Sequence, residues 1–209
     1  MRVKFLRTLL PLLLLSAPLM DYCQVQLTGP TCVVAGTVYQ YIITGHWDSS
    51  STMHLCIAGG TWVGHSDSCT SDQPPVPFVQ IIWNHESSGA VNLQSTAGNA
   101  QIQVTITTPL SGGSIVDSCK ADTIPYNGTP PLINCTPATG GACSPSYSYQ
   151  WQVSVDNIQW QDVDGATGLS CSPGQVLQNT SYYRRKVIET VSSTISYSDA
   201  ACIIVNQSN

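Results

Sequence analysis

Residues 147–163, YSYQWQVSVDNIQWQDV, carry the clearest alternation of apolar and polar side chains in this chain. Aromatic and aliphatic residues occupy the odd positions from 147 to 155, and serine or glutamine occupies the even positions between them. A period of two is typical of a β-strand with one buried face. Asp156-Asn157 then supplies a turn, so we expect residues 158–163 to run back as the second strand of a hairpin. Trp151, in the middle of the first strand, is expected in the core.

Similar strand patterns occur along most of the chain. Residues 38–44, 79–83, 101–107 and 200–205 each read as a short strand, whereas no window shows the apolar repeat of an amphipathic helix. The 16 glycines and 13 prolines suit many strands joined by turns. We therefore expect an all-β protein made of two consecutive antiparallel β-sandwiches, residues 24–108 and 109–209. Barrels are the structural alternative, because periodicity does not separate the two architectures.

The first 23 residues are expected to be a secretory signal peptide. Arg2, Lys4 and Arg7 precede a short apolar run at residues 9–15, and this run is too short to span a bilayer as a stable helix. We expect cleavage after Cys23, with Ala17 as the alternative position. The mature chain is then secreted or held at the cell surface, with no membrane span after removal of the signal.

The balance of charge bears on the class of partner. The chain has 7 basic and 12 acidic residues. Cleavage after Cys23 removes three basic residues and one acidic residue. Such an acidic chain repels phosphate backbones, so we expect no nucleic-acid partner. The remaining basic cluster is Arg184-Arg185-Lys186, which we interpret as solvated residues of an edge strand.

The cysteine count favours disulfide bonds. Of nine cysteines, eight remain after Cys23 is removed, and an even number in an exported chain indicates a disulfide framework. The flexible turn between Cys135 and Cys143, which contains proline and two glycines, makes them the first candidate pair. The other candidates are Cys56 with Cys69 and Cys171 with Cys202, which leaves Cys32 and Cys119.

Residues 147–205 resemble the Ig-like modules of very large bacterial cell-surface proteins, such as the N-terminal regions of Rhs/YD-repeat proteins and gliding-type adhesins. The motifs that carry the resemblance are 147–168, YSYQWQVSVDNIQWQDVDGATG, then YYRRKV at 182–187 and YSDAA at 197–201. The first block resembles the PKD-like modules that often precede them, through ITGHW at 43–47 and IIWN at 81–84. The resemblance implies a non-enzymatic exported module that serves as a structural or adhesion unit, as in the N-terminal part of a larger surface protein.

No pattern of residues indicates catalysis, a cofactor or a metal. The chain has no Cys-x-x-Cys pair and no Gly-x-Ser-x-Gly elbow. Four histidines, at positions 46, 54, 65 and 85, have spacings that do not impose a cluster, and we interpret them as surface-loop residues. We therefore expect no enzyme activity, no cofactor and no metal site.

Exposed aromatic residues leave one alternative function open. Trp62 and Trp160, with Tyr147 and Tyr149, could provide a flat surface for sugar rings, which would make the protein a carbohydrate-binding module. Trp47, Trp83 and Trp151 lie in apolar patterns and are expected in the core. The partner is therefore either a surface protein or a glycan.

Overall fold

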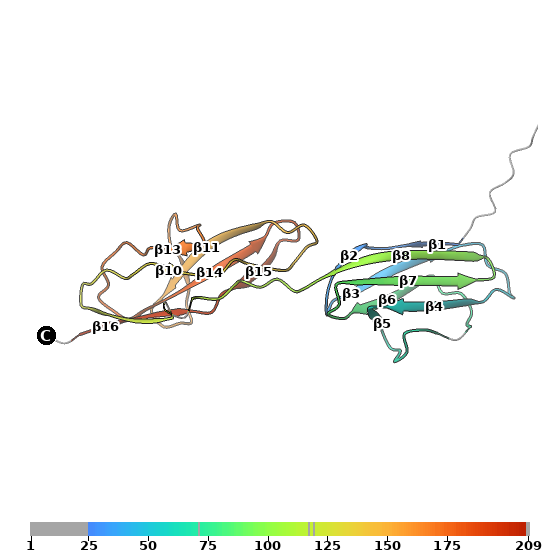
Figure 1. Ribbon diagram of the computed structural model, residues 1–209, viewed down its shortest axis with the longest axis horizontal. Coiled ribbons are helices and arrows are strands. Elements are labelled where there is room, and N and C mark those ends of the chain that lie inside the picture. Colours follow the sequence, from blue (N-terminus) through green and yellow to red (C-terminus); the bar gives the residue numbers. More distant parts are fainter. Residues whose placement is uncertain (1–24, 71, 117, 119, 208–209) are drawn as a thin grey trace, which may run out of the picture.

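The computed structural model describes residues 25–70, 72–116, 118 and 120–207. The expected signal peptide and Cys119 lie outside these residues. Figure 1 shows two β-structured bodies placed end to end and joined by one connecting segment. The described residues form β-strands and no α-helix, so the expectation of an all-β sandwich protein is confirmed. Within the same residues, no helix is long and apolar enough to cross a membrane.

The first sandwich packs two four-stranded sheets against each other. One sheet has the order β1 (Gln26–Thr28), β3 (Val38–Thr44), β6 (Phe78–Trp83) and β5 (Gly60–Trp62). The other has the order β2 (Cys32–Val34), β8 (Gly98–Thr107), β7 (Ser88–Ser95) and β4 (Met53–Ala58). Alternate residues of both sheets point inward, and Tyr41, Ile81, Leu55 and Val91 are fully buried in one shared core.

The second sandwich packs a large sheet against a small one. The large sheet has the order β12 (Gln161–Asp162), β11 (Tyr147–Ser154), β14 (Ser181–Glu189), β16 (Ala201–Asn206) and β9 (Ala121–Pro125), and β15 (Thr194–Tyr197) also pairs with β14. The small sheet contains β10 (Ile133–Asn134) and β13 (Ser170–Cys171). Trp151 is fully buried, as expected, and its indole Nε1 donates a hydrogen bond to the Gly168 carbonyl at 3.0 Å.

Two strand pairs are parallel, although the sequence led us to expect antiparallel sheets throughout. These pairs are β2 with β8 and β9 with β16. In the first sandwich, the chain crosses from one sheet to the other between β1 and β2. Gly29 lies so close to Tyr41 that an added Cβ would be 2.2 Å from the ring, and the Tyr41 hydroxyl donates to the Pro30 carbonyl at 2.8 Å. This contact holds the crossing, after which β2 can pair only with the edge of the facing sheet.

The expected hairpin forms, but its return strand is short. β12 contains only two residues, Gln161 and Asp162, which pair with Val153 and Gln152 of β11. The Asp156 carboxylate accepts hydrogen bonds from the main-chain N–H groups of Ile158 and Gln159, both at 2.8 Å. Because these donors are used within the turn, they are not available to a strand ladder, and Ile158 is left 75% exposed.

β14 is an interior strand, so our interpretation of Arg184-Arg185-Lys186 as an edge strand was wrong. It pairs with β11 on one side and with β15 and β16 on the other. Its side chains alternate between buried and half-buried positions, which places Arg185 inside the sandwich with no exposed surface. The alternation of the strand, and not the charge of the residue, decides which way this side chain points.

Candidate functional site

Main-chain contacts hold the joint between the two sandwiches. β8 ends at Thr107, whose hydroxyl donates a hydrogen bond to the Gly141 carbonyl, and the Gly141 N–H donates to the Thr108 carbonyl at 2.9 Å. At Gly140, φ is 77° and an added Cβ would lie 2.2 Å from the Pro109 carbonyl oxygen. Glycine is therefore required there, and it lets the loop of the second sandwich lie directly against the connecting segment.

A disulfide closes the same joint covalently. Cys32 on β2 is bonded to Cys143, with Cα atoms 5.9 Å apart and a sequence separation of 111. Beside it is a mainly apolar hollow of about 450 Å³, to which both sandwiches contribute. Its lining includes Val34, Tyr39, Leu110 and Ala142. The two sandwiches are thus joined by a covalent bond, by the connecting segment and by hydrogen bonds.

Glu189 supports the joint from within the second sandwich. It is fully buried, and Gly141 lies so close that an added Cβ would be 2.9 Å from the Glu189 Cγ. Its carboxylate accepts hydrogen bonds from the Ser192 hydroxyl at 2.6 Å and from the N–H groups of Ser192 and Val191 at 2.8 and 3.0 Å. These donors, the Ser192 hydroxyl first, lower the pKa of Glu189 to about 2. The carboxylate is therefore ionised at neutral pH.

The pairing of Cys135 with Cys143 expected from the sequence is wrong. Cys135 is buried in the core of the second sandwich, where its main chain bridges that of Ile115, whereas Cys143 is exposed at the joint. The glycines between them have φ values of 77° and 90° and direct the chain toward the first sandwich. The flexible turn therefore separates these two cysteines and brings Cys143 to Cys32.

The expected pairing of Cys171 with Cys202 is also wrong. Both are free cysteines, as is Cys135. Cys171 points into the core from β13, whereas Cys202 occupies an outward position on β16, between buried Ala201 and buried Ile203. Burial raises the pKa of the Cys135 thiol and raises that of Cys171 to about 11. At neutral pH both therefore remain protonated thiols that contribute to packing.

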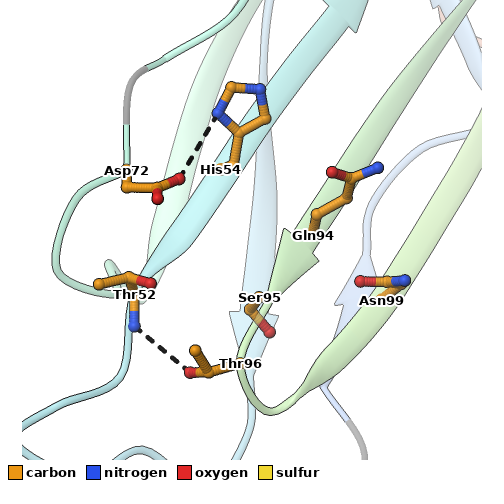
Figure 2. Close-up of a pocket in the computed structure, with 7 residues that line it drawn as sticks. All are labelled: Thr52, His54, Asp72, Gln94, Ser95, Thr96 and Asn99. Carbon is orange, nitrogen blue, oxygen red and sulfur yellow. Dashed lines mark hydrogen bonds and ion pairs between the residues drawn. The ribbon is translucent and has the colours of Figure 1, made fainter.

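The first sandwich has a polar pocket at the end of its β4-β7-β8 sheet. It has a volume of about 630 Å³ and is lined by Thr52, His54, Asp72, Gln94, Ser95, Thr96 and Asn99 (Figure 2). His54, Gln94 and Asn99 lie in one row across the three strands, because His54 pairs with Gln94 and Gln94 pairs with Asn99. The lining offers amides, hydroxyls, a carboxylate and an imidazole, which can donate and accept hydrogen bonds with a polar ligand.

Three side chains meet next to this pocket: Cys56 and Cys69, which are paired as the sequence predicted, and His54, which the sequence did not link to them. The donor atoms of His54, Cys56 and Cys69 all lie within 4.8 Å of one another. Cys56 and Cys69 form a disulfide, and the His54 Nε2 lies 3.3 Å from the Cys56 sulfur. His54 is on strand β4 and not in a loop. A His-x-Cys pair on an alternating strand indicates two side chains on one face, and this was the signal available in the sequence.

The two tryptophans considered as a sugar-binding surface lie on different sandwiches and each already stacks on another side chain. The centroids of the Trp62 and His65 rings lie 4.1 Å apart, and the interplanar angle is 22°. The Arg184 guanidinium carbon lies 4.2 Å from the centroid of the Trp160 ring and 4.1 Å from the centroid of the Tyr197 ring. The structure therefore does not bring the two rings together, and one face of each is covered.

Arg185 connects three segments of the second sandwich. Its guanidinium donates hydrogen bonds to the carbonyls of Gly112 at 2.9 Å, Leu169 at 3.1 Å and Thr136. It also lies 4.4 Å from the centroid of the Tyr149 ring. Gly113 completes the arrangement, since its φ is 77° and an added Cβ would lie 2.3 Å from the Thr136 carbonyl. Main-chain oxygens and an aromatic ring thus take the place of water around the two terminal nitrogens of this buried charge, while its buried Nε has no hydrogen-bond partner among the described residues.

Comparisons with known proteins find likeness in sequence and in structure. Residues 112–207 match the model of a family described as a domain of unknown function, DUF8696. No curated protein matches the chain. Among solved structures, the chain is similar to the three N-terminal domains of the bacteriophage RB49 highly immunogenic outer capsid protein (Hoc), with 10% identity and a TM-score of 0.47 over 88% of this chain and 70% of that one. It is also similar to the tandem Ig repeats of Dlar, with 14% identity and a TM-score of 0.26 over 88% of this chain and 98% of that one. A third similar structure is that of Sidekick-1 immunoglobulin domains 1–5, with 12% identity and a TM-score of 0.31 over 88% of this chain and 39% of that one.

Proposed function

We propose that this protein is an exported, non-enzymatic structural or adhesion module in which a PKD-like domain, residues 24–108, and an Ig-like domain, residues 109–209, form one stiff unit. The joint is the observation that carries the proposal. A covalent bond, a bonded loop and a shared hollow limit the relative rotation of the two sandwiches. β16 runs toward the end of the molecule that is distant from the first sandwich (Figure 1), so a stiff joint keeps attachment points at the two ends apart.

Sequence features support export to the cell surface. The basic and apolar leader at residues 1–23 has the composition of a secretory signal. Disulfides persist in oxidising compartments, and the described residues contain two. The resemblance of residues 147–205 to modules of large bacterial surface proteins points in the same direction. The partner in this proposal is a surface protein.

Solution scattering tests the stiffness of the joint. We expect the oxidised wild-type chain to fit a single elongated conformation, and the Cys32→Ser/Cys143→Ser variant to require a broader distribution of sizes. Cys56→Ser/Cys69→Ser is the matched control, because it removes the disulfide that lies inside one sandwich. A wild-type profile that already requires many conformations would contradict the proposal. Intact-mass spectra of exported protein test the leader, since a mature chain that retains residues 1–23 would contradict secretion through this signal.

Carbohydrate binding is the second candidate function, favoured by the polar pocket and not by the tryptophans. The amide and hydroxyl side chains that line the pocket match the alternating hydrogen-bond donors and acceptors of a sugar (Figure 2). A glycan array probed with the purified chain tests this candidate. If it holds, Gln94→Ala and Asn99→Ala abolish the specific signal while Trp160→Ala retains it. If no glycan is bound, or if Trp160→Ala alone removes binding, the pocket is not the sugar site.

A further inference from the structure

The main chain fixes the positions of Cys56 and Cys69 independently of the bond between their sulfurs. The Ile57 N–H donates to the Ser68 carbonyl at 2.7 Å, and the Thr70 N–H donates to the Leu55 carbonyl at 2.8 Å. These bonds flank the cysteines, so Cys56 and Cys69 form a non-hydrogen-bonded antiparallel pair, the position in which opposite side chains are closest. Because the hydrogen bonds do not involve sulfur, we expect the two thiols to stay adjacent when the disulfide is reduced.

His54 adds a third donor on the same face of β4. Its Nε2 points to the Cys56 sulfur at 3.3 Å, while its Nδ1 lies 3.9 Å from an Asp72 oxygen, the contact drawn as a dashed line in Figure 2. A carboxylate near one ring nitrogen favours the tautomer that leaves the other nitrogen free to bind a metal. Two sulfurs and one imidazole nitrogen within 4.8 Å of one another match the donors and the spacing that zinc takes.

We propose that His54, Cys56 and Cys69 bind a zinc ion when the Cys56–Cys69 disulfide is reduced, so that the disulfide and the metal are alternative states of one site. Reduction transfers two electrons and two protons from an external dithiol, which itself becomes a disulfide, and yields two cysteine thiols. Zinc then binds the two thiolates and the neutral imidazole, and the two thiol protons pass to solvent. Cys69 is exposed, so water occupies the fourth position of the tetrahedron.

The open fourth position distinguishes this site from a closed structural zinc site. Structural sites use four protein ligands, whereas a site with three protein ligands leaves room for an exchangeable group. His54 also lines the polar pocket, so the metal would lie beside that pocket. A polar ligand in the pocket could then reach the ion. The inference does not depend on the proposed structural or adhesive function.

Cobalt(II) substitution tests the proposal through a spectroscopic signal. The full chain is reduced with a phosphine, freed of reductant without oxygen, and titrated with Co²⁺, which gives a near-ultraviolet thiolate-to-metal band when cysteines bind it. We expect a band that saturates at one equivalent, disappears on addition of Zn²⁺, and is absent from the oxidised chain. Reduced wild-type protein that shows no such band would overturn the proposal.

Matched variants assign the signal to these residues. Cys56→Ser/Cys69→Ser should abolish the band while every other thiol is retained, and a band of unchanged strength in this variant would overturn the proposal. His54→Gln keeps the disulfide and so retains the fold, and it should weaken Co²⁺ binding at least about tenfold. His65→Gln removes a histidine that stacks on Trp62 outside the cluster, and its affinity should equal that of the wild type. Equal affinity in His54→Gln would exclude the imidazole as a ligand.

Discussion

Substitution of Arg185 by methionine is expected to destabilise the second sandwich by about 4 kcal/mol. The guanidinium is fully buried and is the common donor for the carbonyls of Gly112, Thr136 and Leu169. Methionine has a similar length but donates no hydrogen bond, so the variant leaves three carbonyl groups without this donor. The segments that contain them are then no longer held together around one side chain.

The expected magnitude follows from two opposing contributions. Each hydrogen bond from a charged donor contributes a net of about 1.5–3 kcal/mol, and three such bonds are lost. Against this, the variant no longer has to remove a guanidinium from water, which costs several kcal/mol in the wild type. Because each buried carbonyl left without a donor costs about 1–3 kcal/mol, the three together account for an expected net loss of about 4 kcal/mol. The contact with the Tyr149 ring is lost as well.

Urea unfolding measures the loss of stability, with tryptophan fluorescence and far-ultraviolet circular dichroism as the two signals. With a slope of about 2 kcal/mol/M, the midpoint of the affected transition should fall by about 2 M. Arg184→Met is the matched control. Its side chain is half-buried between Trp160 and Tyr197, and it should cost only about 1 kcal/mol.

A conservative variant, Arg185→Lys, keeps the prediction testable if the methionine variant does not fold. Arg185→Lys keeps the charge but lacks the planar fork that reaches three carbonyls. We therefore expect its loss of unfolding free energy to lie between that of Arg185→Met and that of the control, Arg184→Met. A methionine variant within about 1 kcal/mol of the wild type would refute the reasoning, since it would mean that the hydrogen bonds contribute no more than their desolvation costs.

The remaining predictions concern the joint, the core and pH. Gly140→Ala should destabilise the protein by about 2 kcal/mol or more in urea unfolding, because it combines a positive φ with a clash, whereas Gly36→Ala has open space and should cost about 1 kcal/mol. Trp151→Ala should cost about 3–5 kcal/mol in the same assay, and Trp160→Ala about 1 kcal/mol. The pKa of Glu189 is about 2, below its ordinary value of 4.5, so its contribution to stability is complete above pH 4.5 and is lost as pH falls toward 2. Glu189→Gln should flatten the stability curve in that pH range.

Each of these predictions has a result that would contradict it. Equal losses in Gly140→Ala and Gly36→Ala would show that the clash with Pro109 relaxes at no cost. Similar losses for the two tryptophan variants would show that burial does not decide their contributions. An unchanged acid slope in Glu189→Gln would mean that other carboxylates account for the loss of stability at low pH.

Local patterns predicted much of the fold. The alternation at residues 79–83 and 101–107 identified strands whose inward side chains Val79, Ile81, Trp83 and Val104 are buried, and the pattern around Trp151 identified β11, a strand of the large sheet of the second sandwich. The return strand at 158–163 was overestimated, because the Asp156 carboxylate binds the N–H groups that a ladder would need. Local hydrogen bonds of this kind depend on geometry, and apolar periodicity does not describe them.

By itself, the sequence determined which faces of the strands are buried, because alternation of side chains is a property of each strand alone. The tertiary structure decided which distant residues meet. It paired Cys143 with Cys32 across the joint and left Cys135 in the core, although Cys135 is much closer in sequence. It also buried Arg185 among carbonyls and placed His54 beside two sulfurs. These outcomes depend on how the sheets pack and on the direction that two glycines give to a loop, which are set only when both sandwiches are complete.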